Sequence, residues 1–196
     1  MGLGAVDKVY RFEVQCCRVP PGKCEVITTG GLSVVSQDAI RVVKDLVHAS
    51  TREIASRMGV DSDGLSLMKR GMDLHVHVDN FAFGKIDKTY QMAPLYMSMV
   101  SLVFGRRMKD DVMVFGDVGS SGSLSCIWKL EVNHIQLYRR HGYRQVIVGF
   151  GAKTKISEEA KATAGAIQSD GRPFVDIVIV GNIMDALPLC FGVLQS

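Results

Sequence analysis

The amino-acid sequence predicts an α/β fold, built as an α+β sandwich. Short segments with alternating apolar residues, typical of strands, are interleaved with longer segments whose apolar residues recur every three to four positions, which is typical of helices. Hydrophobic residues make up 47% of the chain and charged residues 22%, a balance that supports a packed core. The 196 residues contain no internal repeat or interdomain linker, so we expect 1–196 to form one domain with a core over about 9–186.

The first third of the chain is expected to contain two strands and a long helix. The strands are predicted over residues 9–17 and 25–29, and the Pro20-Pro21-Gly22 sequence between them favours a hairpin. A helix is predicted over residues 36–58, with Ser36 as its N-cap. The apolar residues that recur at helical spacing in this helix are Ile40, Val43, Val47, Ile54 and Met58.

Strands and helices continue to alternate in the rest of the chain. Residues 72–78 alternate cleanly and predict a strand, and a helix should begin near Gln91 because Pro94 is tolerated only in a first turn. Further strands are expected over 112–118, 124–128, 145–148 and 174–180. Further helices are expected over 130–140, from Ser157, and from Asn182 to about Leu187. The predicted core residues are Leu74, Val76, Val78, Met92, Met99, Val103, Val114, Ile147 and Ile179.

Three motifs in one order carry a family resemblance. Residues 73–78 have the sequence Asp-Leu-His-Val-His-Val, residues 101–106 Ser-Leu-Val-Phe-Gly-Arg, and residues 110–118 Asp-Asp-Val-Met-Val-Phe-Gly-Asp-Val. This order resembles the proteolytic domain of Lon-type ATP-dependent proteases, and the similarity extends from about Val9 to Ala186. The resemblance implies a ribosomal protein S5 domain 2-like fold that is usually assembled as a hexameric ring.

The two catalytic residues of that family are replaced in this chain. The family carries a serine nucleophile ahead of a helix that ends near Gly-Arg, and counting back from that dipeptide places Tyr90 at the serine position. Counting back from the turn at residues 140–142 places Val132 at the position of the catalytic lysine. Valine cannot accept a proton and a phenol is poorly suited to acyl transfer, so the Ser-Lys dyad is predicted to be lost. The fallback is a displaced dyad of Thr89 and Lys129.

Two other groups of side chains are candidate sites. His75 and His77 share one face of a strand with Asp73, which is a geometry that can chelate a metal, but no third ligand stands at an obvious spacing. We therefore expect a structural role for these histidines, and neither a metal nor a cofactor. Arg139, Arg140 and Arg144 form a basic cluster that is suited to phosphate contacts or, at a helix C-terminus, to the helix dipole.

Composition and motifs limit the partners, the cellular location and the ATPase activity that we expect. The net charge of +3 does not by itself imply nucleic acid, and no apolar run is long enough for a membrane helix, so no membrane partner is expected. The five cysteines match no zinc framework and are typical of reduced thiols, which favours an intracellular location, cytoplasmic or in an organellar matrix. The sequence contains no Walker motif, so any ATPase activity must come from an AAA+ module in cis or in trans.

The sequence therefore favours a Lon-protease-like domain that is proteolytically inactive and serves as an assembly or binding platform. Two alternatives remain open. One is an active ATP-dependent Lon-type serine endopeptidase domain with a displaced dyad, acting on unfolded protein. The other is a nucleic-acid-binding accessory domain that contacts DNA through the arginine cluster.

Overall fold

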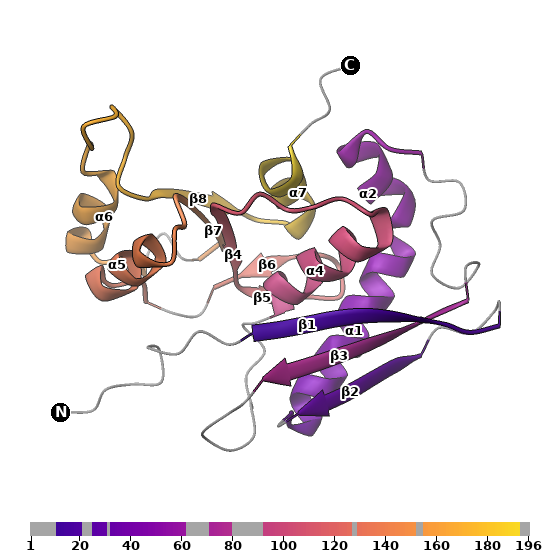
Figure 1. Cartoon of the computed structure of the whole chain (residues 1–196). Helices are drawn as coiled ribbons and strands as arrows, with labels where there is room; N and C mark the ends of the chain where they lie inside the picture. The colour runs from indigo at the N-terminus through magenta and orange to yellow at the C-terminus, as the bar shows by residue number, and fades with distance from the viewer. Residues whose placement is uncertain are drawn as a thin grey trace.

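Two three-stranded sheets with helices packed between and around them make up a mixed α/β fold (Figure 1). The computed structural model describes residues 11–20, 25–30, 32–61, 71–79, 92–126, 129–151 and 155–192. The first sheet contains β1 (Arg11–Arg18), β2 (Val26–Gly30) and β3 (Met72–Asp79) in the order β1-β3-β2. The second contains β4 (Val112–Phe115), β7 (Gln145–Gly149) and β8 (Asp176–Val180) in the order β4-β7-β8.

The predicted hairpin of the first two strands is wrong, because β3 lies between β1 and β2. β3 runs antiparallel to β1 and parallel to β2. Leu74 and Val76 of β3 are fully buried, so this strand takes the central place, where one face of the sheet is covered by helices. A parallel pair requires a long crossover, and α1 (Val34–Ala49) and α2 (Thr51–Met58) lie within the connection from β2 to β3.

The single helix predicted over residues 36–58 is two helices. Ser50 separates α1 from α2 and has a non-helical backbone (φ −95°, ψ 10°). The break allows α1 to pack against α4 (Met92–Phe104) while α2 packs against α7 (Ile183–Phe191). The predicted N-cap is also wrong: the Ser33 hydroxyl accepts the hydrogen bond from the Ser36 backbone N–H at 3.2 Å, and Ser36 is buried inside the first turn.

The strand predicted over residues 112–118 is interrupted at Gly116. β4 ends before it, and β5 (Asp117–Val118) then pairs antiparallel with β6 (Leu124–Ser125). Gly116 has a φ of +148°, and a Cβ there would lie 2.7 Å from the Ser125 carbonyl oxygen. Only glycine therefore fits at this position, where the chain passes close to the backbone of Ser125. The strand predicted over 124–128 is shorter than expected, and residues 127–128 lie outside the described part of the chain.

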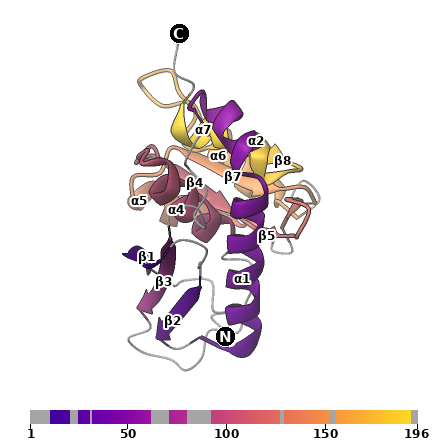
Figure 2. The same cartoon turned by 90° about the vertical axis from the view of Figure 1, so that its right-hand side faces the viewer.

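Helices cover both faces of the second sheet, as the two views of the molecule show (Figures 1 and 2). α4 and α7 lie on one side, whereas α5 (Val132–Arg140) and α6 (Glu158–Gly165) lie on the other. The predicted starts of α6 and α7 are confirmed, since the side chains of Ser157 and Asn182 cap these helices.

Two hydrophobic cores result, one on each side of the second sheet. Ile147 of β7 belongs to the first core, whereas its neighbours Val146 and Val148 belong to the second. The predicted core residues that are buried are Leu74, Val76, Met92, Met99, Val103, Val114 and Ile147. Ile179 is half-buried against the second core, and the side chain of Val78 lies outside the described part of the structure.

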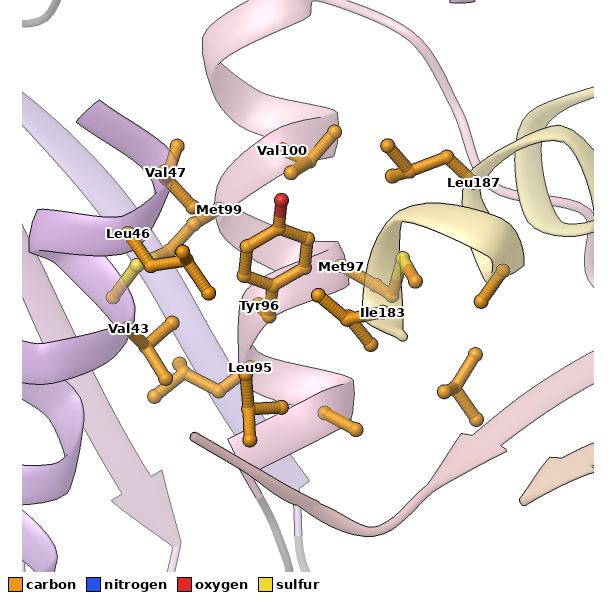
Figure 3. Close-up of a cluster of buried hydrophobic side chains, with 14 of the residues drawn as sticks. Val43, Leu46, Val47, Leu95, Tyr96, Met97, Met99, Val100, Ile183 and Leu187 are labelled. Atoms are coloured by element: carbon orange, nitrogen blue, oxygen red, sulfur yellow. The ribbon is translucent and has the colours of Figure 1, made fainter. Parts of the chain in front are cut away.

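Tyr96 lies at the centre of the first core. Figure 3 shows its ring on α4, between α1 and α7. The phenol is fully buried and its hydroxyl donates to the Met184 sulfur at 3.4 Å. Burial raises the pKa of the Tyr96 hydroxyl well above its ordinary value. Tyr96 is therefore a neutral core residue that holds three helices together.

Candidate functional site

The beginning of α5 is the part of the expected catalytic site that the structure describes. Val132 is the first residue of the helix, and its half-buried side chain packs against the second core. Glu131 is the N-cap residue, and its backbone N–H donates to Nδ1 of the buried His134 at 3.0 Å. That imidazole nitrogen must be unprotonated to accept the bond. The helix start is thus capped, and the position that the motif count assigns to the catalytic lysine offers no amine.

Lys129, the fallback base, lies three residues before Val132 and faces solvent. Its side chain is 64% exposed, and its ammonium nitrogen lies 3.3 Å from Oε1 of Glu131. A lysine that acts as a general base is usually desolvated or placed beside another cation. Lys129 has the opposite surroundings, a carboxylate and water.

The other half of the expected site lies on residues 80–91, outside the described part of the chain. Both the vestigial nucleophile position, Tyr90, and the fallback nucleophile, Thr89, fall in this segment. The family resemblance implies that Tyr90 and Val132 face each other across the site, and this stays a prediction.

The Ser-x-x-x-Gly-Arg motif forms a structural anchor at the end of α4. Gly105 adopts a left-handed conformation with φ +62°, which ends the helix. The Ser101 hydroxyl donates to the Arg106 carbonyl oxygen at 2.6 Å, and the Arg106 backbone N–H donates to the Ser101 carbonyl oxygen at 3.0 Å. The guanidinium of Arg106 then donates to the carbonyl oxygen of Met58, at the end of α2, at 2.6 Å. The motif therefore joins two helices and does not itself supply a reactive group.

His75 and His77 lie on the same face of β3, as predicted, and share a partner that the sequence analysis missed. Nε2 of His75 lies 2.9 Å from the hydroxyl oxygen of Thr29, and Nδ1 of His77 lies 2.8 Å from the same atom. One hydroxyl thus ties β2 to both histidines across the sheet. Thr29 could be found only once β2 was known to be the neighbour of β3, because no spacing along the chain relates residues 29 and 75. Among the described residues, no group of three or more His, Cys, Asp or Glu side chains could hold a metal ion.

The three arginines of the basic cluster lie around the C-terminal end of α5, but two of them are engaged. The guanidinium of Arg139 lies 5.6 Å from the ring centroid of Phe174. Arg144 forms an ion pair with Asp170 at 3.0 Å, and Arg140 is exposed. Phe174 and Asp170 were missed by the sequence analysis because both follow α6, far along the chain from α5.

A match to a family model establishes the family of this chain. No helix in the described part of the chain combines the length and the apolar character needed to cross a membrane. A comparison with curated proteins finds no match for the chain. A model of the Lon protease (S16) C-terminal proteolytic domain matches residues 10–176, which is most of the chain, so this protein belongs to that family.

Proposed function

We propose that this Lon-type domain is proteolytically inactive and serves as an assembly or binding platform, with the ribosomal protein S5 domain 2-like arrangement of its family. The observation that carries the proposal is Val132, which occupies the expected lysine position and packs into the second core. The general-base role requires an amine at this position, and the nearest lysine in sequence, Lys129, is exposed and paired with Glu131. The tyrosine at the nucleophile position supports the same conclusion from the sequence.

A proteolysis assay tests the proposal. The chain is incubated with an unfolded protein substrate, alone and with a Lon ATPase module supplied in trans with ATP. We expect no cleavage above background, whereas a Lon proteolytic domain with an intact Ser-Lys dyad cleaves under the same conditions. Turnover by the wild-type chain that disappears in Thr89→Ala would establish the displaced dyad and overturn the proposal. In that case Lys129→Met, compared with the exposed control Lys161→Met, would show whether Lys129 is the base.

A platform of this family is expected to associate with itself and with an AAA+ ATPase module in cis or in trans. We infer a concentration-dependent assembly in which a head-to-tail contact closes into a ring. Interfaces of this kind bury roughly 1,200–2,000 Å² in total. The family resemblance supports a hexamer.

The second candidate function is nucleic-acid binding through the basic cluster. It is favoured by Arg140, which is exposed beside Arg139 and Arg144 at the end of α5. If DNA binds there, its affinity falls steeply with salt concentration, and Arg140→Glu weakens binding without changing assembly. A mobility shift at low salt that Arg140→Glu leaves unchanged would exclude this surface, and Arg52→Glu, at an exposed position of α2, is the matched control.

A further inference from the structure

Exposed apolar side chains gather around β2 and α1. In the described part of the chain, six large hydrophobic residues are exposed, namely Ile27, Val34, Val35, Val42, Phe150 and Ile167. The first four belong to β2 and α1, which pack against each other. Ile27 is the one member of this set that lies within a strand of the described structure, and it is 47% exposed. A group of exposed apolar side chains on adjacent elements is typical of an interaction surface.

In the described structure, β2 is an edge strand of the first sheet. Some of its backbone N–H and C=O groups point away from β3. The Leu74 backbone N–H donates to the Glu25 carbonyl oxygen at 2.9 Å, and the register pairs Val26 with Leu74. In a parallel ladder, this arrangement turns the backbone groups of Ile27 and Thr29 toward β3. Those of Val26 and Thr28 consequently point to the outer side of the sheet, where the described structure places no further strand. An edge of this kind is a template for strand addition.

Exposed apolar side chains lie on β2 itself and on the helix that packs against it. α1 packs against β2 and covers one face of the sheet, and its residues Val34, Val35 and Val42 are exposed. Ile27 lies on the opposite face, beside His75 in the register of β2 and β3. Natural edge strands are commonly protected by charged residues or proline, and β2, with the sequence Val-Ile-Thr-Thr-Gly, contains neither.

The charges beside the edge indicate what kind of partner fits it. On α1, Arg41 lies 2.8 Å from Asp38 and Lys44 lies 2.9 Å from Asp45, so these four charges sum to zero. Nucleic acid would require an excess of positive charge at this surface. With the exposed Glu25 just before β2, the net charge of this surface is about −1, too small to repel an identical surface strongly, which favours a second copy of this chain.

We propose that β2 pairs antiparallel with β2 of a second copy across a two-fold axis. The outward groups of Val26 and Thr28 then bond to those of the partner's Thr28 and the partner's Val26. In that register Ile27 stands opposite the partner's Ile27 as a non-hydrogen-bonded pair, in which side chains are closest. This contact would give the exposed isoleucine a partner and join the two first sheets into one. The inference rests on the proposed platform role, but the contact is isologous and differs from the head-to-tail contact of a ring.

Two variants of the full chain test the contact by sedimentation velocity over a range of concentrations. Thr28→Pro removes an outward N–H and leaves the inward bonds of Ile27 and Thr29 to β3 in place. Ile27→Lys puts like charges opposite each other across the axis. The control Ile167→Lys changes another exposed isoleucine, which lies outside β2 and α1. We expect the wild type and the control to dimerise alike, and each β2 variant to weaken the dimer more than about tenfold because each contact is lost twice across the axis.

The outcomes separate this inference from the proposed function. A dimer or ring that neither β2 variant weakens would leave the platform role standing and overturn the β2 contact. A wild-type chain that remains monomeric at all concentrations would overturn both the β2 contact and the proposed assembly. Proteolytic turnover would end the proposed inactivity without affecting the dimer. Circular dichroism of each variant verifies folding. If Thr28→Pro does not fold, the sedimentation of Ile27→Lys by itself tests the β2 contact.

Discussion

Gly149 shows how a single missing atom can determine the packing of this fold. A Cβ at this position would lie 2.5 Å from the backbone carbonyl carbon of Ser125 and 2.6 Å from its Cα. β6 can therefore cross the end of β7 only because residue 149 has no side chain. The sequence contains no local sign of this requirement, since a glycine after a predicted strand is equally typical of a simple turn.

Replacing Gly149 with alanine should destabilise the protein, whereas the same replacement at Gly165 should not. The added methyl group at residue 149 meets backbone atoms that cannot move aside, and we expect a loss of about 2–3 kcal/mol. At Gly165, the last residue of α6, a Cβ meets nothing within 4 Å, and alanine should stabilise the helix by about 0.5–1 kcal/mol. Urea unfolding of both variants measures the difference. Equal effects at the two positions would show that the β6 crossing adapts to a side chain.

At the scale of elements, the connection between α6 and β8 is a small hairpin fastened to β7 through one carboxylate. Ile167 and Pro173 form an antiparallel bridge, and the loop between them carries Asp170. The Asp170 carboxylate accepts the backbone N–H of Arg172 at 3.1 Å and pairs with Arg144 at 3.0 Å. These two interactions, the backbone bond first, lower the pKa of Asp170 below its ordinary value of 3.8.

The contribution of Asp170 to stability should therefore depend on pH in acid. Because its pKa is lower in the folded chain than in the unfolded one, the contribution is present above about pH 4 and is lost as the pH falls through the folded-state pKa. Asp170→Asn should flatten this part of the stability profile, and Glu158→Gln, on the exposed start of α6, is the control. An NMR titration of the Asp170 carboxyl group gives the pKa directly. A midpoint at or above 3.8 would contradict the assigned pairing.

Element order was predictable from the sequence, but strand neighbours were not. Alternation in residues 72–78 and capping by Ser157 and Asn182 are local signals, and the structure confirms them. The placement of β3 between β1 and β2 depends on burying Leu74 and Val76 beneath helices, which is a property of the tertiary fold. The candidate site shows the same difference between local sequence signals and contacts that depend on the tertiary fold. Counting along a motif assigns Val132 to the family's lysine position, which stays a prediction, whereas the Thr29 hydroxyl between two histidines appears only after β2 and β3 are paired.

At the scale of the whole molecule, the second sheet belongs to both cores and should couple them. Ile147 faces the first core, whereas the adjacent Val148 faces the second, and both are fully buried. A loss of packing on one face consequently disturbs a strand on which the other core depends. α5, whose first residue stands where the motif count expects the family's lysine, packs in the second core. Val132 thus contributes to the packing of the second core.

This coupling predicts that the chain unfolds in one cooperative transition. Ile147→Ala should lower the free energy of unfolding by about 2–5 kcal/mol, because it removes a fully buried side chain from the middle of the shared sheet. Hydrogen exchange should show the same loss of protection for the most stable amides of α4, in the first core, and of α6, in the second. The exposed substitution Ile167→Ala is the control and should leave both unchanged. If Ile147→Ala accelerated exchange in α4 alone, the two cores would be independent units, and the sheet between them would be a boundary instead of a common support.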